Sequence, residues 1–467
     1  MSLNNIQKQK RPVLLPRGTG RSFFSLSLGE KIENHLLMIK ILATSDWHLG
    51  EYFHSSDRLK EQQHFLNWLK QKAATLQPDA LLVAGDVFDN SNPSAAAQET
   101  YYNFLSEITE ACPDMTIVVI AGNHDSATRL TAPAALLKKH HIEVRGRVDR
   151  QWIPSDNKPG EGQWIFNTEN LIIPIYTKTK DERTWIAALP YVRNSELGYD
   201  NSYPQSMRKL ITQLMTDANN RREANEAVIM MAHFYATGAE IANNSSENII
   251  VGGLEQINVA DMDTRPTCLI CGHIHKRQAI WNTSWARYTG SPLSMSFAEK
   301  NNKHGIDLIT IESGKMIGNP HFIEYTTQRQ LIEIPEEGAL PLEQVIRQIG
   351  QLPRKQQDSP ETMSYVAVKL CREDIDLTSR KQISDELSKR HAIFSKLQCI
   401  EKMEVSQTAD ENKPTESSLD DIYQRNPLDA IIIGFIRENQ IAISERQIQL
   451  AQTAINEAQN MNEEEEA

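Results

Sequence analysis

Residues 39–50 read IKILATSDWHLG, an apolar run that ends abruptly in residues able to bind a metal. A continuous apolar run of about four to seven residues is typical of a strand buried on both faces. Four further runs in the chain end in the same way. The runs and the polar residues that follow them are 39–44 before Asp46 and His48, 81–84 before Asp86, 116–121 before Asn123, His124 and Asp125, 228–232 before His233, and 268–271 before His273 and His275.

These polar residues point to a metal centre at the ends of the strands. Asp, Asn and His are ligand types that divalent transition metals take. Asp46 and His48 alternate with one residue between them, so an extended chain would direct both to one side. Asp86 is the natural bridge between two ions, because a carboxylate has two oxygens. The pattern therefore predicts a two-metal phosphoryl-transfer site.

Each motif alone is weak evidence. An isolated D-x-H occurs often by chance, and a G-D pair after a strand usually marks a turn. A lone histidine after an apolar run, such as His233, is more often a core residue than a ligand. Five such motifs in one chain favour the metal centre over these simpler explanations.

The order D-x-H, G-D, G-N-H-D, H and G-H-x-H resembles that of the calcineurin-like metallophosphoesterases. Within that family, the segments TSDWHLG (44–50) and GNHDS (122–126) are similar to bacterial DNA repair nuclease subunits that work with an ABC-type ATPase. The motifs extend over residues 38–325. The resemblance implies an α/β sandwich of two mixed sheets flanked by helices, with a small α+β capping domain and a C-terminal helical tail.

The resemblance also implies roles for the site residues. The first ion would be bound by Asp46, His48, Asp86 and His275, and the second by Asp86, Asn123, His233 and His273. Manganese is the expected ion, and iron or zinc also suit mixed oxygen and nitrogen ligands. His124 would approach the scissile phosphate and the leaving oxygen. Asp125 would either orient that imidazole or cap the following helix, and Glu299 is expected to be structural.

The chain is expected to divide into several parts, because 467 residues exceed one ordinary core. Residues 1–37 precede Met38, where the resembled family begins, and are either an extension or a consequence of an upstream start codon. The nuclease domain is expected over 38–325, the capping domain over 326–404, a polar linker over 405–420, and the helical tail over 421–467.

The tail contains a helix that could bind a partner. Asn426 can cap it and Pro427 suits its first position. An apolar stripe follows at helical spacing. Such stripes usually pack on their own domain, but in the resembled family this region docks on the coiled coil of the ATPase. The stripe consists of Leu428, Ile432, Phe435 and Ile436.

Composition limits the environment and the partners. Forty per cent of the residues are hydrophobic, yet no apolar stretch reaches the ~18 residues that span a bilayer. No secretory signal is evident, and five cysteines do not suggest a disulfide framework, which indicates the cytoplasm. Cys268 and Cys271 are expected to be packed thiols. The net charge of −12 favours a second, more basic subunit for tight DNA binding.

The expected function is hydrolysis of DNA phosphodiesters in repair, recombination and replication. The resemblance implies exonuclease and endonuclease action on double-strand ends and hairpins. It also implies a homodimer within a heterotetramer that contains the ATPase, and association with the nucleoid. The chain has no G-x-x-x-x-G-K-[ST] motif, so ATP hydrolysis must come from the partner. The alternatives are a metallophosphoesterase that acts on nucleotides or phosphoproteins, and an inactive scaffold.

Truncation after Val405 tests the tail. We expect the shortened chain to hydrolyse a small phosphodiester but to lose the ATPase, because three or four buried apolar side chains contribute ~1.5–3 kcal/mol each before ordering costs. Co-purification of the two proteins measures the loss. If the truncated chain still co-purifies with the ATPase in the full ratio, the apolar stripe does not bind the ATPase and packs within its own chain instead.

Overall fold

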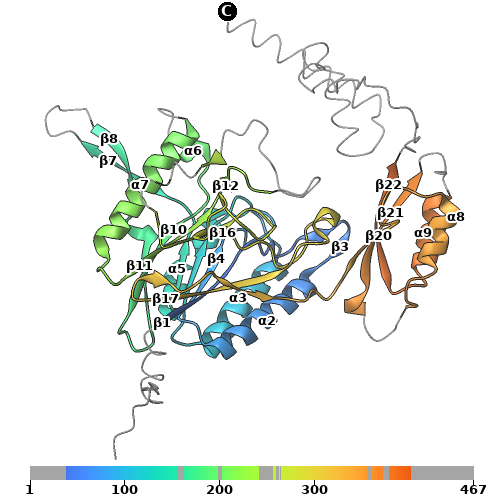
Figure 1. The fold of residues 1–467 in the computed structure, drawn as a ribbon, viewed down its shortest axis with the longest axis horizontal. Helices are drawn as coiled ribbons and strands as arrows, with labels where there is room; N and C mark the ends of the chain where they lie inside the picture. Colours follow the sequence, from blue (N-terminus) through green and yellow to red (C-terminus); the bar gives the residue numbers. More distant parts are fainter. Residues whose placement is uncertain are drawn as a thin grey trace, which may run out of the picture. The chain divides into compact units, whose positions relative to one another are not determined.

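The computed structural model describes residues 38–154, 162–197, 202–240, 256–258, 262, 265–355, 360–371 and 378–400 (Figure 1). These residues belong to one compact unit. The extension 1–37 and the tail 421–467, with its stripe of Leu428, Ile432, Phe435 and Ile436, lie outside the described residues. None of the described helices combines the length and apolar character that a bilayer-spanning helix needs.

The first sheet has seven strands in the order β18-β17-β1-β4-β5-β6, with β19 also paired to β17. Its centre is parallel, and β17 runs antiparallel to β1. The strands are β1 (Met38–Thr44), β4 (Ala80–Ala84), β5 (Thr116–Ile120), β6 (Ile142–Arg145), β17 (Gly305–Glu312), β18 (Lys315–Met316) and β19 (His321–Glu324).

The second sheet has six strands in the order β15-β16-β14-β11-β10-β9. Here β10, β11, β14 and β16 are parallel, and the two edge strands are antiparallel. The predicted pair of mixed sheets is therefore confirmed. The strands are β9 (Ile172–Tyr176), β10 (Arg183–Leu189), β11 (Ala227–His233), β14 (Cys268–Gly272), β15 (Gln278–Ala279) and β16 (Ala286–Tyr288).

The alternation of side chains along each strand explains why the runs are almost entirely apolar; in β1 the one charged residue, Lys40, is only partly buried. In β1, Ile39, Ile41 and Ala43 face the second sheet, where they meet residues such as Ile229 and Ile270. Leu42 points the opposite way, into the cluster beneath the helices. Because successive side chains of a strand point to opposite faces, a strand covered on both sides needs apolar residues at every position.

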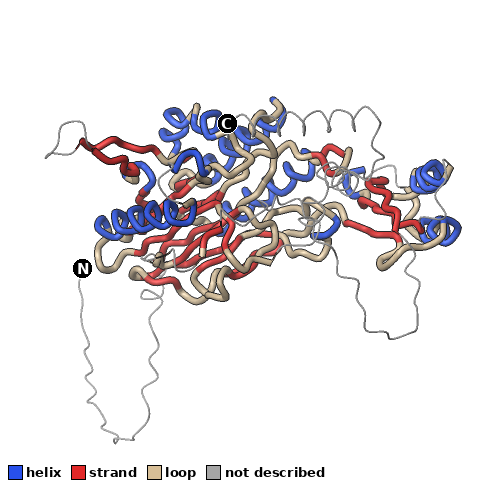
Figure 2. Tube along the Cα trace, turned by 90° about the horizontal axis from the view of Figure 1, so that it is seen from above, coloured by secondary structure: helices blue, strands red, loops and turns tan. Residues whose placement is uncertain are grey.

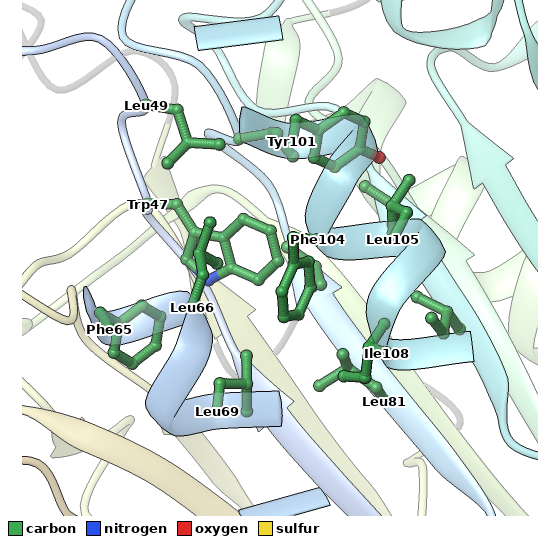
Figure 3. Close-up of a cluster of buried hydrophobic side chains, with 14 of the residues drawn as sticks. Trp47, Leu49, Phe65, Leu66, Leu69, Leu81, Tyr101, Phe104, Leu105 and Ile108 are labelled. Carbon is green, nitrogen blue, oxygen red and sulfur yellow. The ribbon is translucent and has the colours of Figure 1, made fainter. Parts of the chain in front are cut away.

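Two long helices, α2 (Leu59–Leu76) and α3 (Ala95–Ala111), cover the outer face of the first sheet. Figure 3 shows Phe65 and Leu69 of α2 and Phe104 of α3 around Trp47, which belongs to the D-x-H motif. The Trp47 and Phe104 rings meet edge to face at 5.4 Å. The first metal motif is thus anchored in the main core by its own middle residue.

The second sheet is covered by α7 (Tyr203–Arg221), which begins with a capping box between Ser202 and Gln205. The short strands and α-helices around the two sheets are β2 (Tyr52–Phe53), β3 (Ser56–Asp57), β7 (Asp149–Pro154), β8 (Gly162–Asn167), β12 (Tyr235–Ala236), β13 (Gln256–Ile257), α4 (Ala127–Thr131), α5 (Ala134–Leu137) and α6 (Asn194–Leu197).

A smaller α+β module follows the two sheets. Its three parallel strands are β20 (Leu331–Ile334), β21 (Ser364–Cys371) and β22 (Ala392–Ile400). The helices α8 (Leu342–Ile349) and α9 (Ser379–Leu387) both lie on one side of this sheet (Figures 1 and 2). Val345, Ile383, Val366 and Val368 form its own core. We refer to residues 326–400 as the cap.

Two stretches show how the local sequence shapes the elements. The amphipathic segment 57–76 forms α2, which begins at Leu59, where the carboxylate of Asp57 accepts the Leu59 N–H at 2.8 Å. The interval 151–183, which lacks clean periodicity, contains β7, β8, β9 and the start of β10. These strands carry exposed aromatic residues such as Trp152, so the usual apolar alternation is lost.

Candidate metal centre

The ends of the parallel strands bring the sequence motifs together. Backbone pairing continues beyond β1 and β4, where Asp46 N donates to Gly85 O at 3.0 Å and His48 N donates to Asp86 O at 3.0 Å. The D-x-H and G-D motifs therefore lie beside each other. The motifs that follow β5, β11 and β14 come to the same place, as the side-chain distances show.

The backbone at this edge is strained. Asp46, His48 and Asp86 have φ angles of 53°, 45° and 49°, in the left-handed region that L-residues rarely adopt. The prediction that Asp46 and His48 alternate along an extended chain is therefore wrong in its geometry. Both side chains still reach one site, because one ligand atom from each lies within 4.8 Å of one from His275. Such strain is characteristic of functional sites.

Three glycines allow the loops to approach one another. A β-carbon at Gly122 would collide with the carboxylate of Asp86, and one at Gly85 would collide with the imidazole of His233. A β-carbon at Gly272 would collide with the carbonyl oxygen of Ala84. The glycines of the G-D, G-N-H-D and G-H-x-H motifs thus make room for their neighbours' ligands.

Asp46, His48 and His275 form the first cluster, and all three are buried. The Nε2 atom of His48 is buried and has no hydrogen-bond partner among the described residues. Two carboxylates outside the sequence motifs support the imidazoles: Asp89 Oδ1 lies 3.7 Å from His48 Nδ1, and Glu299 Oε1 lies 3.5 Å from His275 Nδ1. Carboxylates in this position orient metal-binding histidines.

The second cluster is centred on the side-chain oxygen of Asn123. This atom lies 2.9 Å from both His233 Nε2 and His273 Nδ1. His233 Nε2 is also 3.3 Å from Asp86 Oδ2, and that same oxygen is 3.7 Å from His48 Nε2. Asp86 therefore stands between the two clusters, in the position expected for a bridging carboxylate.

Electrostatics at Asp86 match this arrangement. Burial raises the pKa of Asp86, but His233 outweighs it and holds the pKa well below its usual range. Burial lowers the pKa of His233, but the Asp86 carboxylate outweighs it and raises the pKa to about 9. Burial lowers the pKa of His273 to about 3, helped by the positive His233. A buried imidazolium thus compensates the carboxylate in the metal-free chain.

The donor set fits divalent metal ions. His48 Nε2 makes no hydrogen bond among the described residues, so it can bind a metal ion. His233 Nδ1 lies 2.9 Å from the carbonyl oxygen of Ala84, which leaves Nε2 as the atom of His233 that can bind an ion. Loss of the Nε2 proton would accompany ion binding. The chain would hold one ion with Asp46, His48, Asp86 and His275, and a second with Asp86, Asn123, His233 and His273.

His124 lies beside the clusters and is held separately. Its backbone N–H donates to Asp86 Oδ1 at 2.9 Å, and its Nδ1 lies 2.7 Å from the carbonyl oxygen of Asp89. The carbonyl accepts a hydrogen bond from Nδ1–H, so Nε2 is the ring nitrogen that can contact a substrate. One ligand atom of His124 lies within 4.8 Å of those of His48 and Asp86.

Asp125 has a different position from either of the two expected. The helix cap is Ser126, so the interpretation of Asp125 as that cap is wrong. The carboxylate of Asp125 instead accepts N–H bonds from Val87 at 3.1 Å, Phe88 at 3.0 Å and Gly122 at 2.9 Å. Burial and the nearby Asp86 raise the pKa of Asp125 to about 6. Asp125 therefore ties the G-D loop to the G-N-H-D loop.

Sequence reasoning missed three polar residues around the centre. Asp89 follows the G-D motif by three residues, a local signal that could have been noticed. Glu299, expected to be structural, is the carboxylate partner of His275. The exposed Arg193 has a guanidinium Nη2 3.5 Å from the carbonyl oxygen of Asn123, and nothing in its local sequence indicates this.

A two-metal donor set at the edge of an α/β sandwich is the arrangement of a phosphoesterase. Residues 39–277 match the calcineurin-like phosphoesterase family, and the chain belongs to that family. Three relatives are named as the SbcD subunit of the nuclease SbcCD. The one from Rhodobacter capsulatus is 28% identical over 67% of this chain and 76% of the relative. Those from Bacillus subtilis and Escherichia coli K12 are 29% and 30% identical, over 59% and 60% of this chain and 67% and 66% of the relatives.

Substitution Asp86→Asn tests the bridge. We expect it to weaken binding of both ions, because the amide keeps the shape but loses the charge between the clusters. Calorimetric titration of the metal-free protein with Mn²⁺ measures the number and affinity of the sites. Asp79→Asn, before the opposite end of β4, is the matched control, since this carboxylate accepts the backbone N–H of Lys40 at 2.8 Å. Two unaltered sites in Asp86→Asn would refute the bridging role.

Proposed function

We propose that this protein is a metal-dependent DNA nuclease subunit that hydrolyses phosphodiesters. The observation that carries the hydrolytic part is the convergence of seven metal-competent side chains on two adjoining clusters that share Asp86. The similarity to the SbcD subunits of the SbcCD nucleases of three bacteria supports DNA as the substrate.

The chemistry follows from the positions of the side chains. The proposed ions are two Mn²⁺, which when bound would act as Lewis acids toward the phosphate and the attacking water. His124, protonated at Nε2, donates that proton to the departing oxygen, while the Asp89 carbonyl fixes the ring. Asp125 keeps His124 in place through the backbone of the loops. Arg193 supplies an exposed positive charge beside Asn123, where a phosphate oxygen can bind.

The proposed assembly follows the name shared by the relatives. The partner is an SbcC-like ABC ATPase with a coiled coil, bound by the helical tail, and two copies of each subunit form a heterotetramer. The proposed substrates are double-strand ends and hairpins, cut by exonuclease and endonuclease action during repair, recombination and replication. The proposed location is the cytoplasm, at the nucleoid when the complex is on DNA.

Cleavage of a hairpin-ended duplex tests this function. We expect Mn²⁺-dependent cutting that the ATPase and ATP stimulate, with chelation by EDTA abolishing it. A nucleotide and a phosphopeptide serve as competing substrates in the same assay. Hydrolysis of these two without cleavage of DNA would assign the site to small-substrate phosphatase chemistry instead.

His124→Ala separates chemistry from metal binding. We expect both ions to bind normally while turnover falls by ~10²–10⁴-fold, the usual contribution of a general acid. Calorimetry with Mn²⁺ and single-turnover cleavage give the two quantities. His141→Ala, an exposed histidine just before β6, is the control. Loss of one ion in His124→Ala would make His124 a ligand and contradict the acid role.

A further inference from the structure

The first turn of α2 lies between the metal-binding turn at residues 46–51 and the cap. Its residues Glu61 and Gln62 are both buried, although polar residues of a surface helix usually face water. The two side chains are neighbours in sequence and point to different partners. Their contacts connect two parts of the molecule that the sequence places about 300 residues apart.

Gln62 holds the metal-binding turn. Its side-chain Nε2 donates to the carbonyl oxygen of His48 at 2.6 Å, and its Oε1 accepts the N–H of Gly50 at 3.0 Å. The carboxamide therefore satisfies both of its ends on one turn of backbone. His48 has a φ of 45°, a conformation that persists only where the surroundings enforce it. The His48 carbonyl accepts hydrogen bonds from Gln62 Nε2 and from the backbone N–H of Glu51, at 3.0 Å, so Gln62 is its side-chain partner.

Glu61 holds the cap. Its Oε1 accepts the hydroxyl of Tyr365 from β21 at 2.5 Å and lies 3.3 Å from Nε of Arg329, which precedes β20. Tyr365 also packs on Phe53, with 4.7 Å between ring centroids. The carboxylate is buried, so loss of a donor from the cap leaves charge less well compensated.

Arg58 carries the same network to the other side of the first cluster. Its Nη1 donates to Glu51 Oε2 at 3.0 Å and to the carbonyl oxygen of Ser294 at 2.6 Å. Ser294 belongs to the segment that ends at Glu299, the partner of His275. Arg58 Nε is 3.7 Å from Glu61. Arg58, the residue before α2, thus links Glu61 to the segment that carries Glu299, while Gln62 in the first turn holds the backbone of His48.

From this network we infer that Gln62 is a positioning residue for the first metal ion, and that the cap acts on the same ion through Glu61. The helix turn is rigid, so a displacement of Glu61 moves Gln62 with it. The contact between the cap and Glu61 therefore affects how tightly the cluster of Asp46, His48 and His275 binds its metal ion. The second cluster, formed by Asn123, His233 and His273, has no contact with Gln62 in the described hydrogen bonds. This inference rests on the proposed two-metal site.

Gln62→Met tests the contact between α2 and the metal-binding turn. The methionine has a similar length but makes neither hydrogen bond to the turn. We expect one of the two Mn²⁺ affinities to fall about tenfold or more while the other stays within twofold, because the His48 carbonyl and the Gly50 N–H lose their side-chain partner. Gln63→Met is the control, because Gln63 lies next in the helix and donates instead to the Thr100 hydroxyl of α3, at 3.0 Å.

Tyr365→Phe tests the contact between the cap and Glu61, because it removes only the hydroxyl that bonds to this carboxylate. We expect the same Mn²⁺ affinity to fall by about two- to fivefold. Tyr325→Phe is the matched control, because the Tyr325 hydroxyl also bonds to α2, at His64 Nδ1 2.7 Å away, outside the first turn. Thermal unfolding of each metal-free variant separates a loss of stability from a selective loss of one ion.

The outcomes separate this inference from the proposed function. Unchanged affinities at both sites in either Gln62→Met or Tyr365→Phe, or an equal loss at both, overturn the inference, whatever the protein cleaves. Binding of two ions without any cleavage of DNA overturns the proposed function and leaves the inference standing, because the titrations contain no DNA.

Discussion

The buried carboxylate of Asp86 dictates how the whole centre is built. An ionised carboxylate inside a protein is costly unless charges and hydrogen bonds compensate it. Here the compensation comes from His233 at 3.3 Å, from His48 at 3.7 Å and from the His124 backbone N–H at 2.9 Å. Each of these groups comes from a different loop. Keeping Asp86 charged therefore requires that four chain segments meet at one point.

That meeting requires unusual backbone. Asp46, His48 and Asp86 adopt left-handed conformations, and Gly85, Gly122 and Gly272 leave no room for a β-carbon. The large apolar clusters on both faces of the two sheets supply the stability that holds these strained turns. Asp125, buried on three backbone N–H groups, locks two of the loops together. The scaffold is thus rigid where the site is strained.

The cap belongs to the same argument. Its own core is small, and its contacts with the two-sheet part include the apolar cluster of Phe53, Phe297, Tyr365 and Ala367, the bond from Tyr365 to Glu61, and the ion pair of Lys300 with Glu333. In the coupling that we infer, the cap reaches the first metal cluster through the first turn of α2, by way of Glu61 and Gln62.

The buried strands and the candidate ligands at their ends could be predicted from the amino-acid order, because strands covered on both faces need apolar runs and metal ions need Asp, Asn and His. The arrangement of those strands in two sheets was implied by the resemblance to the calcineurin-like metallophosphoesterases. The supports of those ligands could not be predicted. Glu299 lies in a segment without a distinctive pattern, and the pattern of the helix that contains Gln62 comes from its apolar residues. Asp125 had two local explanations, neither of which described its bonds. Their roles emerge from the folded chain, since each depends on a contact between segments that sequence spacing does not specify. The left-handed turns at Asp46 and His48 arise in the same way, because packing and hydrogen bonds from distant residues enforce a conformation that the local sequence disfavours.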